Sequence, residues 1–364
     1  MNYRILITIF SFYIFFSCNS SKKNEISILK TKSFVTDFNS LYYTQVVKQN
    51  NGLSKIYYLD IIHNKIYSYK STDFKIVDSI NLSNYKQLYN VKGLVGRFYV
   101  VDSNNFYLLS SNLKQVYHIR EGVLNVINFP NKIKETLFIG SKWFHVIDNK
   151  LYLNGYINTL SNSNKLNKQE LIATLNSKDE IIELYNSTPS FPDIYLDGNN
   201  YNDLSTNYIS KCVNGRNESI YSFPIEHNLF IYENNRFVKK TDAKSKFLNE
   251  FITTPDNLLL DIQHTMKLYI TAPYYREVIY DRYRNLYYRV ADIENDKIKD
   301  NGKQQLFSDK NWGLIILNDK FNIINEIQFS NKTNLAGILP VKEGLLIINS
   351  TRKDKLVLDL YEVK

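Results

Sequence analysis

The sequence predicts an all-β protein built as a single β-propeller of six or seven blades, and three observations support that prediction. Short apolar runs alternate with clusters of Asn, Asp, Ser and Lys along most of the chain. Similar two-strand units recur at intervals of roughly 40–75 residues. No Gly-, Ser- or Pro-rich linker divides the 364 residues, which favours one closed body.

The recurring unit is an apolar strand that ends at an aspartate, a turn that carries an asparagine, and a second apolar strand. It occurs at 55–69, 97–110 and 143–155. Its aspartates are Asp60, Asp102 and Asp148. Such a unit can bury its apolar face only against a neighbour, so several must stack, as the blades of a propeller do. A large β-sandwich or two β domains are the alternative folds.

The end of the chain indicates how the ring closes. Residues 344–364 contain two strands, so a strand from residues 26–47 is expected to complete the last blade. That closure would remove a free sheet edge. The domains expected are therefore a signal peptide at 1–17, a flexible tether at 18–25 and a propeller at 26–364.

One segment, 241–268, interrupts the succession of strands. Phe247, Leu248 and Phe251 have helical spacing, which predicts a short helical insertion between two blades. The polar stretches 158–170 and 293–305 are predicted surface loops.

Composition and charge narrow the class of protein. A hydrophobic fraction of 44% and a charged fraction of 22% exclude a globally disordered chain. The formal net charge is +9, and +8 once residues 1–17 are removed. Because the lysines are scattered, no nucleic-acid partner is predicted. An anionic lipid or acidic polymer suits this charge better, and a solvated surface is the simplest explanation.

The N-terminus has the layout of a secretory signal, with Arg4 followed by an apolar run from Ile5 to Phe16. "FFSC" resembles the lipobox of bacterial lipoproteins, with Phe15 where Leu is usual, as Bacteroidetes lipoproteins tolerate. The resemblance implies that Cys18 is lipidated and anchors the protein in the cell envelope. An ordinary signal peptide is the alternative. The basic "NSSKKNE" after Cys18 favours the periplasmic side of the outer membrane over the cell surface.

The other cysteine and the histidines give no sign of a metal, a cofactor or a nucleophile. With Cys18 acylated, Cys212 has no intrachain partner, so no disulfide is expected, and Cys212 is predicted to be a small strand residue. None of the sequence patterns of hydrolases, P-loops or dinucleotide sites occurs. No two of the five histidines lie at i, i+4 spacing. The Asp–Asn turns could offer oxygen ligands to calcium, but such residues more often stabilise their own turns.

The stretch "YYREVIYDRYRNLYYR" at 274–289 holds six tyrosines and four of the ten arginines of the chain. It predicts a hairpin whose turn presents Arg282, Tyr283 and Arg284 to solvent. Arginine clamps carboxylates and stacks on tyrosine, so either cross-strand packing or a surface for an acidic or sugar-like ligand would explain the cluster. The ligand surface would comprise Tyr283, Arg282, Arg284, Arg276 and Tyr287.

This hairpin, "YDRYRNLYYR" at 280–289, resembles the domain-of-unknown-function family 4221 of Bacteroidetes lipoproteins. The family pattern has proline after the aspartate, where this chain has Arg282. The resemblance implies a propeller-like lipoprotein with no established activity.

Three classes of function remain open. The favoured one is a monomeric binding module for a partner protein or an extracellular glycan. The others are a propeller hydrolase or lyase acting on a sugar or lactone, and a structural envelope protein without a small ligand. Clustered Asp, Glu and His in the channel would favour an enzyme, and an open Tyr/Arg surface would favour binding.

Overall fold

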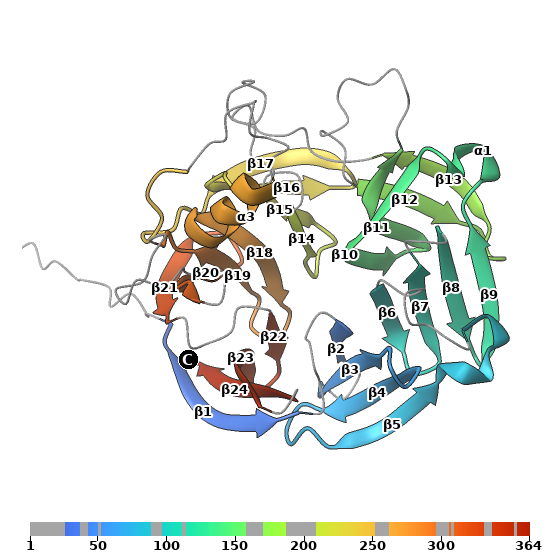
Figure 1. The fold of residues 1–364 in the computed structure, drawn as a ribbon, viewed down its shortest axis with the longest axis horizontal. Helices are drawn as coiled ribbons and strands as arrows, with labels where there is room; N and C mark the ends of the chain where they lie inside the picture. The colour runs from blue at the N-terminus through green and yellow to red at the C-terminus, as the bar shows by residue number, and fades with distance from the viewer. Residues whose placement is uncertain are drawn as a thin grey trace, which may run out of the picture.

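The computed structural model describes residues 26–36, 43–49, 52–88, 97–110, 114–157, 170–186, 209–251, 262–295, 306, 309–330, 337–352 and 355–364. Within them, the strands form six four-stranded antiparallel sheets, which surround a central axis as blades (Figure 1). The predicted all-β propeller is confirmed, with six blades. Residues 1–25, with the predicted signal peptide, Cys18 and tether, lie outside the described residues, as do most of the predicted loops at 158–170 and 293–305.

The blades are numbered along the chain. Within each blade, the strands are given in order from the innermost, next to the central axis, to the outermost. Blades 1 and 2 comprise β2 (Thr44–Lys48), β3 (Ser54–Asp60), β4 (Lys65–Lys70), β5 (Ile76–Asn81), β6 (Arg97–Asp102), β7 (Asn105–Ser110), β8 (Gln115–Arg120) and β9 (Val123–Asn128). Blades 3 and 4 comprise β10 (Leu137–Ile147), β11 (Lys150–Ile157), β12 (Glu170–Leu175), β13 (Ile181–Asn186), β14 (Ser210–Val213), β15 (Ser219–Ser222), β16 (Asn228–Glu233) and β17 (Arg236–Asp242). Blades 5 and 6 comprise β18 (Tyr274–Asp281), β19 (Leu286–Asp292), β20 (Trp312–Leu317), β21 (Ile323–Phe329), β22 (Ile338–Val341), β23 (Gly344–Arg352), β24 (Lys355–Val363) and β1 (Ile28–Val35).

Blade 6 closes the ring with both ends of the chain. Its outermost strand is β1, which pairs with β24 from Ile28↔Val363 to Val35↔Val357. Ser27 and Lys364 extend the ladder by exchanging two backbone hydrogen bonds of 2.9 Å. Figure 1 shows β1 at the perimeter beside β24, with the C-terminus near its start. The predicted closure by a strand from residues 26–47 is confirmed.

The hydrophobic core lies between neighbouring blades. One cluster joins Leu59 of blade 1 to Phe106 of blade 2, and comparable clusters join blades 2 and 3, 4 and 5, 5 and 6, and 6 and 1. The contact between blades 3 and 4 also holds a buried ion pair, described below. Because each sheet is covered by its neighbours on both sides, its middle strands contain long apolar runs, as in β20 (WGLIIL).

The Asp–Asn turns bind their own backbone. Asp60 Oδ1 accepts from the amides of Ile62 and His63, each at 3.0 Å, and Asp102 Oδ1 accepts from Asn104 at 2.8 Å. These are the turn-stabilising bonds expected of such residues. The repeats are out of phase, however, because 55–69 forms the second and third strands of its blade, whereas 97–110 and 143–155 contain the first and second.

The helical insertion lies later than its sequence pattern predicted. Helix α3 (Ile262–Thr271) connects blades 4 and 5, but residues 243–251 are not helical. There the Ser245 hydroxyl and the Lys246 amide both donate to the Glu326 carboxylate. These hydrogen bonds to β21 of blade 5 hold the segment in an irregular conformation, although its apolar residues have helical spacing. A second helix, α1 (Asn131–Lys134), follows β9.

Candidate functional site

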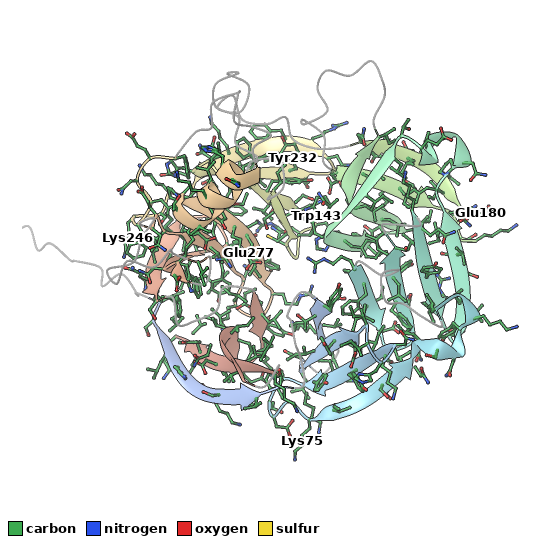
Figure 2. All side chains as sticks on the ribbon, viewed as in Figure 1. Lys75, Trp143, Glu180, Tyr232, Lys246 and Glu277 are labelled. Atoms are coloured by element: carbon green, nitrogen blue, oxygen red, sulfur yellow. The ribbon has the colours of Figure 1, made fainter. Side chains whose placement is uncertain are left out.

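The candidate site is the central channel. A cavity of about 620 Å³ is lined by the innermost strands of blades 1–5. An adjoining cavity of about 200 Å³ is lined by β2, β18 and β22, so together the two involve all six blades. In Figure 2, Trp143 and Glu277 lie beside the central opening. The combined volume suits a small molecule or the end of a chain.

Two arginines reach the channel from blade 5 in different ways. Arg276 is the extra residue of a β-bulge, since the register passes from Tyr275↔Ala291 directly to Glu277↔Val290. Its guanidinium pairs with the fully buried Asp292, with Nε 3.1 Å from Oδ2. Arg282, in the turn after β18, is exposed and makes no hydrogen bond or ion pair with the described residues. Arg282 therefore has the more available charge of the two.

One wall of the channel is aromatic and includes a neutral imidazole. His145 on β10 stacks near Trp143, with ring centroids 6.4 Å apart, and meets the edge of Tyr99 at 6.2 Å. Burial, together with the charges of Lys211 and Arg97, lowers the pKa of His145 to about 3. Its Nε2 atom is buried and has no hydrogen-bond partner among the described residues. At neutral pH this imidazole is uncharged, so it is poorly suited to general acid–base catalysis.

A buried ion pair joins blades 3 and 4 behind this wall. The Lys211 ammonium on β14 binds the Glu170 carboxylate, and Tyr221 Oη donates to the same carboxylate at 2.5 Å. The ammonium also lies 4.4 Å from the ring centre of Tyr152. Burial lowers the pKa of Lys211, while Glu170 opposes that shift. Because each charge is already satisfied by the other, the pair serves to hold the two blades together.

Cys212 is the free cysteine among the described residues, and it lines the channel beside Lys211. Burial raises the pKa of its thiol, so it stays protonated and does not supply a thiolate nucleophile. The predicted strand position is confirmed, since Cys212 lies in β14. In the described part of the chain, no group of three His, Cys, Asp or Glu side chains is arranged to hold a metal.

The five residues predicted as a ligand surface do not form one surface. Arg282 and Arg276 line the channel, whereas Tyr287 is buried and its hydroxyl accepts from Asn214 at 2.8 Å. Tyr283 is half-buried and accepts from the Ser54 hydroxyl at 2.7 Å. The expectation that Tyr283 and Arg284 face solvent is wrong, because this turn packs on blades 6 and 1.

Arg284 fastens the turn of blade 5 to that of blade 6. Its guanidinium binds the buried Asp281 at 2.8 Å and donates to the carbonyls of Val341 and Lys342 at 3.0 and 2.8 Å. Asp281 Oδ2 also accepts from the Tyr288 hydroxyl at 3.0 Å. The tyrosines and arginines of this hairpin are thus largely structural.

Arg289 fastens the other end of the hairpin to blade 4. It is fully buried, and its guanidinium carbon lies 3.4 Å from the ring centre of Tyr275. It donates to the Ser222 hydroxyl and to four backbone carbonyls of blade 4. These carbonyls belong to Phe223, Glu226, His227 and Ala243. The planar fork with five donors explains why arginine and not lysine occupies this position.

Sequence patterns did not identify the channel residues Arg97, Trp143, His145 and Lys211. Each lies in a strand that looks like any other apolar strand, and the residues come from different blades. The useful signal was a polar residue inside an apolar run, as at His145 in "WFHVID" and Lys211 in "YISKCV".

The strand order, the N-terminal closing strand and the lined channel define this protein as a six-bladed β-propeller. The family model of DUF4221, a domain of unknown function, matches residues 128–328, and the chain belongs to that family. The match includes the arginine-rich hairpin, so the resemblance read from residues 280–289 is confirmed.

Solved structures agree on the fold. A DUF4221 member from Bacteroides vulgatus is 20% identical and superposes with a TM-score of 0.73, covering 94% of this chain and 99% of its own. A Bacteroides fragilis protein designated as exported is 12% identical with a TM-score of 0.53, covering 93% and 95%. A streptogramin B lyase is 10% identical with a TM-score of 0.42, covering 93% of this chain and 98% of its own. This similarity is too low to indicate an activity. None of the curated protein sequences matches this chain.

Proposed function

We propose that this protein is an envelope-anchored binding module whose central channel takes the acidic end of an extracellular glycan. The observation that carries the proposal is Arg282, an exposed arginine without an ion pair among the described residues, at the end of an aromatic-walled cavity of about 620 Å³. An unpaired guanidinium recognises a carboxylate or sulfate, and aromatic rings pack against sugar faces.

The lining favours binding over catalysis. Among the described residues, the cavity lining contains one carboxylate, that of Glu277, and one imidazole, that of His145. The His145 pKa of about 3 keeps that imidazole neutral, and the Cys212 thiol stays protonated. The hydrolase or lyase alternative needs an acid or base whose pKa lies near the working pH. Neither His145 nor Cys212 meets that requirement, which leaves Glu277 as the acid–base candidate of that alternative.

The anchor in this proposal is lipidated Cys18, on the periplasmic side of the outer membrane. Its support is the lipobox-like "FFSC" after an apolar run. The exported neighbour from Bacteroides fragilis has the same fold. No helix among the described residues is long and apolar enough to cross a membrane.

Calorimetry with oligogalacturonates and with neutral glucose oligomers of equal length tests the proposed ligand. We expect the acidic series to bind and Arg282→Glu to abolish that binding. Arg236→Glu, which reverses another exposed arginine on the outer strand β17, is the matched control and should bind as the natural protein does. Equal binding by both variants, or a preference for the neutral series, would contradict the proposal. Capture of an envelope protein instead would indicate the partner-protein alternative.

A further inference from the structure

The start of the closing strand identifies one face of the propeller. Strand β1 begins opposite the end of β24, at Ile28↔Val363, and Lys30 pairs with Tyr361. Tyr361 pairs in turn with Leu345, next to the turn between β22 and β23. Residue 26, where the described chain begins, therefore lies at the same end of blade 6 as the turn 342–343.

Hydrogen bonds show that the corresponding turns of blades 5 and 1 lie on that face as well. Arg284 of blade 5 donates to the Lys342 carbonyl at 2.8 Å. The Lys342 amide donates to Ser54 Oγ at 2.9 Å, directly after the blade 1 turn 49–53. We call this side, defined by Ser27 and the turns 49–53, 282–285 and 342–343, the tether face.

The chain between Cys18 and residue 26 is short. Eight residues extend at most about 29 Å. To bring the opposite face to the membrane, the chain would first have to run back along the length of β1, which is about 27 Å for its eight residues. That path would use nearly the whole extended tether, so a lipid on Cys18 favours the orientation with the tether face toward the membrane.

On blades 6 and 1, the tether face presents side chains that suit the anionic headgroups of lipids. Lys48 and Lys342 are exposed and form no ion pair with the described residues. Lys364 is exposed and pairs with the half-buried Glu362 at 3.2 Å. Leu29 and Leu53 are 58% and 44% exposed. These five residues, Leu29, Lys48, Leu53, Lys342 and Lys364, form the tether-face patch.

Exposed apolar side chains follow the same face around the ring. Every outermost strand has one among its first three residues, at the end that adjoins the tether face. They are Leu29, Ile76, Val77, Val123, Ile182, Phe237, Val238 and Ile323. Acidic residues also occur there. Glu343 lies beside the patch, and Asp73, Glu121, Glu180 and Asp319 lie in turns farther out. Blades 6 and 1 are where exposed lysines and leucines lie next to the start of β1, so the patch is placed there.

We infer that the tether-face patch docks on the anionic lipid headgroups of the membrane that carries the anchor. This inference rests on the proposed lipidation of Cys18. Lysines attract anionic phosphates, and exposed leucines enter the headgroup region. Docking leaves the other end of the channel, where β2 and β6 begin at Thr44 and Arg97, open to the aqueous side. A ligand enters there, and its acidic end reaches Arg282 at the membrane-side end of the same cavity.

The orientation is tested on the full lipidated protein in phosphatidylcholine vesicles with phosphatidylglycerol. An environment-sensitive dye is attached at Leu53→Cys or, as the control, at Lys86→Cys, which follows β5 on the opposite face. The native Cys212 is buried and Cys18 is acylated, so the dye goes to the new cysteine. We expect a blue shift at position 53 alone. A shift at position 86 alone, or at neither position, would overturn the inference.

The charge contribution is tested without the lipid, so that it does not depend on the anchor. Cys18→Ser protein is sedimented with the same vesicles at low salt. Lys48→Glu with Lys342→Glu should weaken binding by about 25-fold or more, at about fivefold for each lysine. Lys86→Glu with Lys244→Glu, on the opposite face, should leave binding unchanged. Equal loss in both pairs would overturn the inference. A protein that carries no lipid but still binds through Lys48 and Lys342 would contradict the anchor and support the patch.

Discussion

Replacing Arg289 tests whether the arginine-rich hairpin holds the ring together. The guanidinium satisfies four carbonyls of blade 4 from its position in blade 5, two in buried bonds and two in partly buried bonds. Leaving a buried acceptor without a donor costs roughly 1–3 kcal/mol. Arg289→Ala should therefore lower the free energy of unfolding by at least about 4 kcal/mol, a large part of the roughly 5–15 kcal/mol of a typical domain.

Two other arginines of the hairpin give a graded comparison. Arg284→Ala loses one ion pair and two carbonyl bonds in a half-buried place, so about 1–3 kcal/mol is expected. Arg282→Ala should change stability by less than about 0.5 kcal/mol, because its side chain is exposed and lacks partners among the described residues. The predicted order of destabilisation is Arg289, then Arg284, then Arg282.

Urea unfolding followed by fluorescence of the buried Trp143 and Trp312 measures this order. If Arg289→Ala does not fold, Ser222→Ala provides a milder test, since it removes only the acceptor of Arg289 Nε and should cost about 1 kcal/mol. Arg289→Lys keeps the charge but loses the planar fork and should remain clearly destabilised. An Arg289→Ala protein as stable as the natural one, or Arg282→Ala as damaging as Arg289→Ala, would refute the clamp.

Three further predictions concern the anchor, the closing strand and the channel wall. Cys18→Ala should abolish incorporation of a fatty-acid probe and release the protein from membranes; equal labelling of this variant would exclude the lipoprotein. Deleting residues 26–36 removes β1 and its ladder with β24, so thermal unfolding should fall sharply or end in aggregation, and an unchanged melting curve would count against closure by this strand. Because the pKa of His145 is about 3 when folded and about 6.5 when unfolded, the unfolded chain binds the extra proton between these values. Stability should therefore fall by about 1.4 kcal/mol for each pH unit below about 6.5. His145→Phe should reduce this acid sensitivity in urea unfolding, with a remainder from His118 and His227, whose pKa values burial also lowers. The exposed His63→Gln should keep the sensitivity in full.

The propeller could be predicted because its blades share local rules. Alternating apolar residues recur along the chain, and Asx-stabilised turns occur in blades 1–5, at Asp60, Asp102, Asn176, Asn214 and Asp281. The same uniformity explains why 55–69 looks like 97–110 in the sequence, although it forms the second and third strands of its blade and not the first and second. All hairpins of a blade use similar turn chemistry, so Asp60 marks the second turn of blade 1 while Asp102 marks the first turn of blade 2.

The channel wall could not be predicted because its residues meet only through the closed ring. Trp143 and His145 of blade 3 lie near Lys211 of blade 4, and those strands are far apart along the chain. Likewise Arg289 finds its acceptors in the turn 223–227 through the contact of two blades. Periodicity predicts which face of a strand a residue lies on. It does not predict which polar residues of different blades lie at the same height in the channel.

In the arginine cluster, the structural roles and the proposed ligand-binding role belong to different residues of one hairpin. Arg276, Arg284 and Arg289 each bind an acidic or carbonyl acceptor that is buried or lies between blades, which requires the fixed donor geometry of guanidinium. Arg282 has no such acceptor among the described residues. Its position follows the first residue of a turn, where many residue types are compatible with the backbone, so the fold does not demand arginine there. Contacts within blade 5 and between blades thus account for three of the four arginines, and the fourth is available to the proposed ligand of the channel.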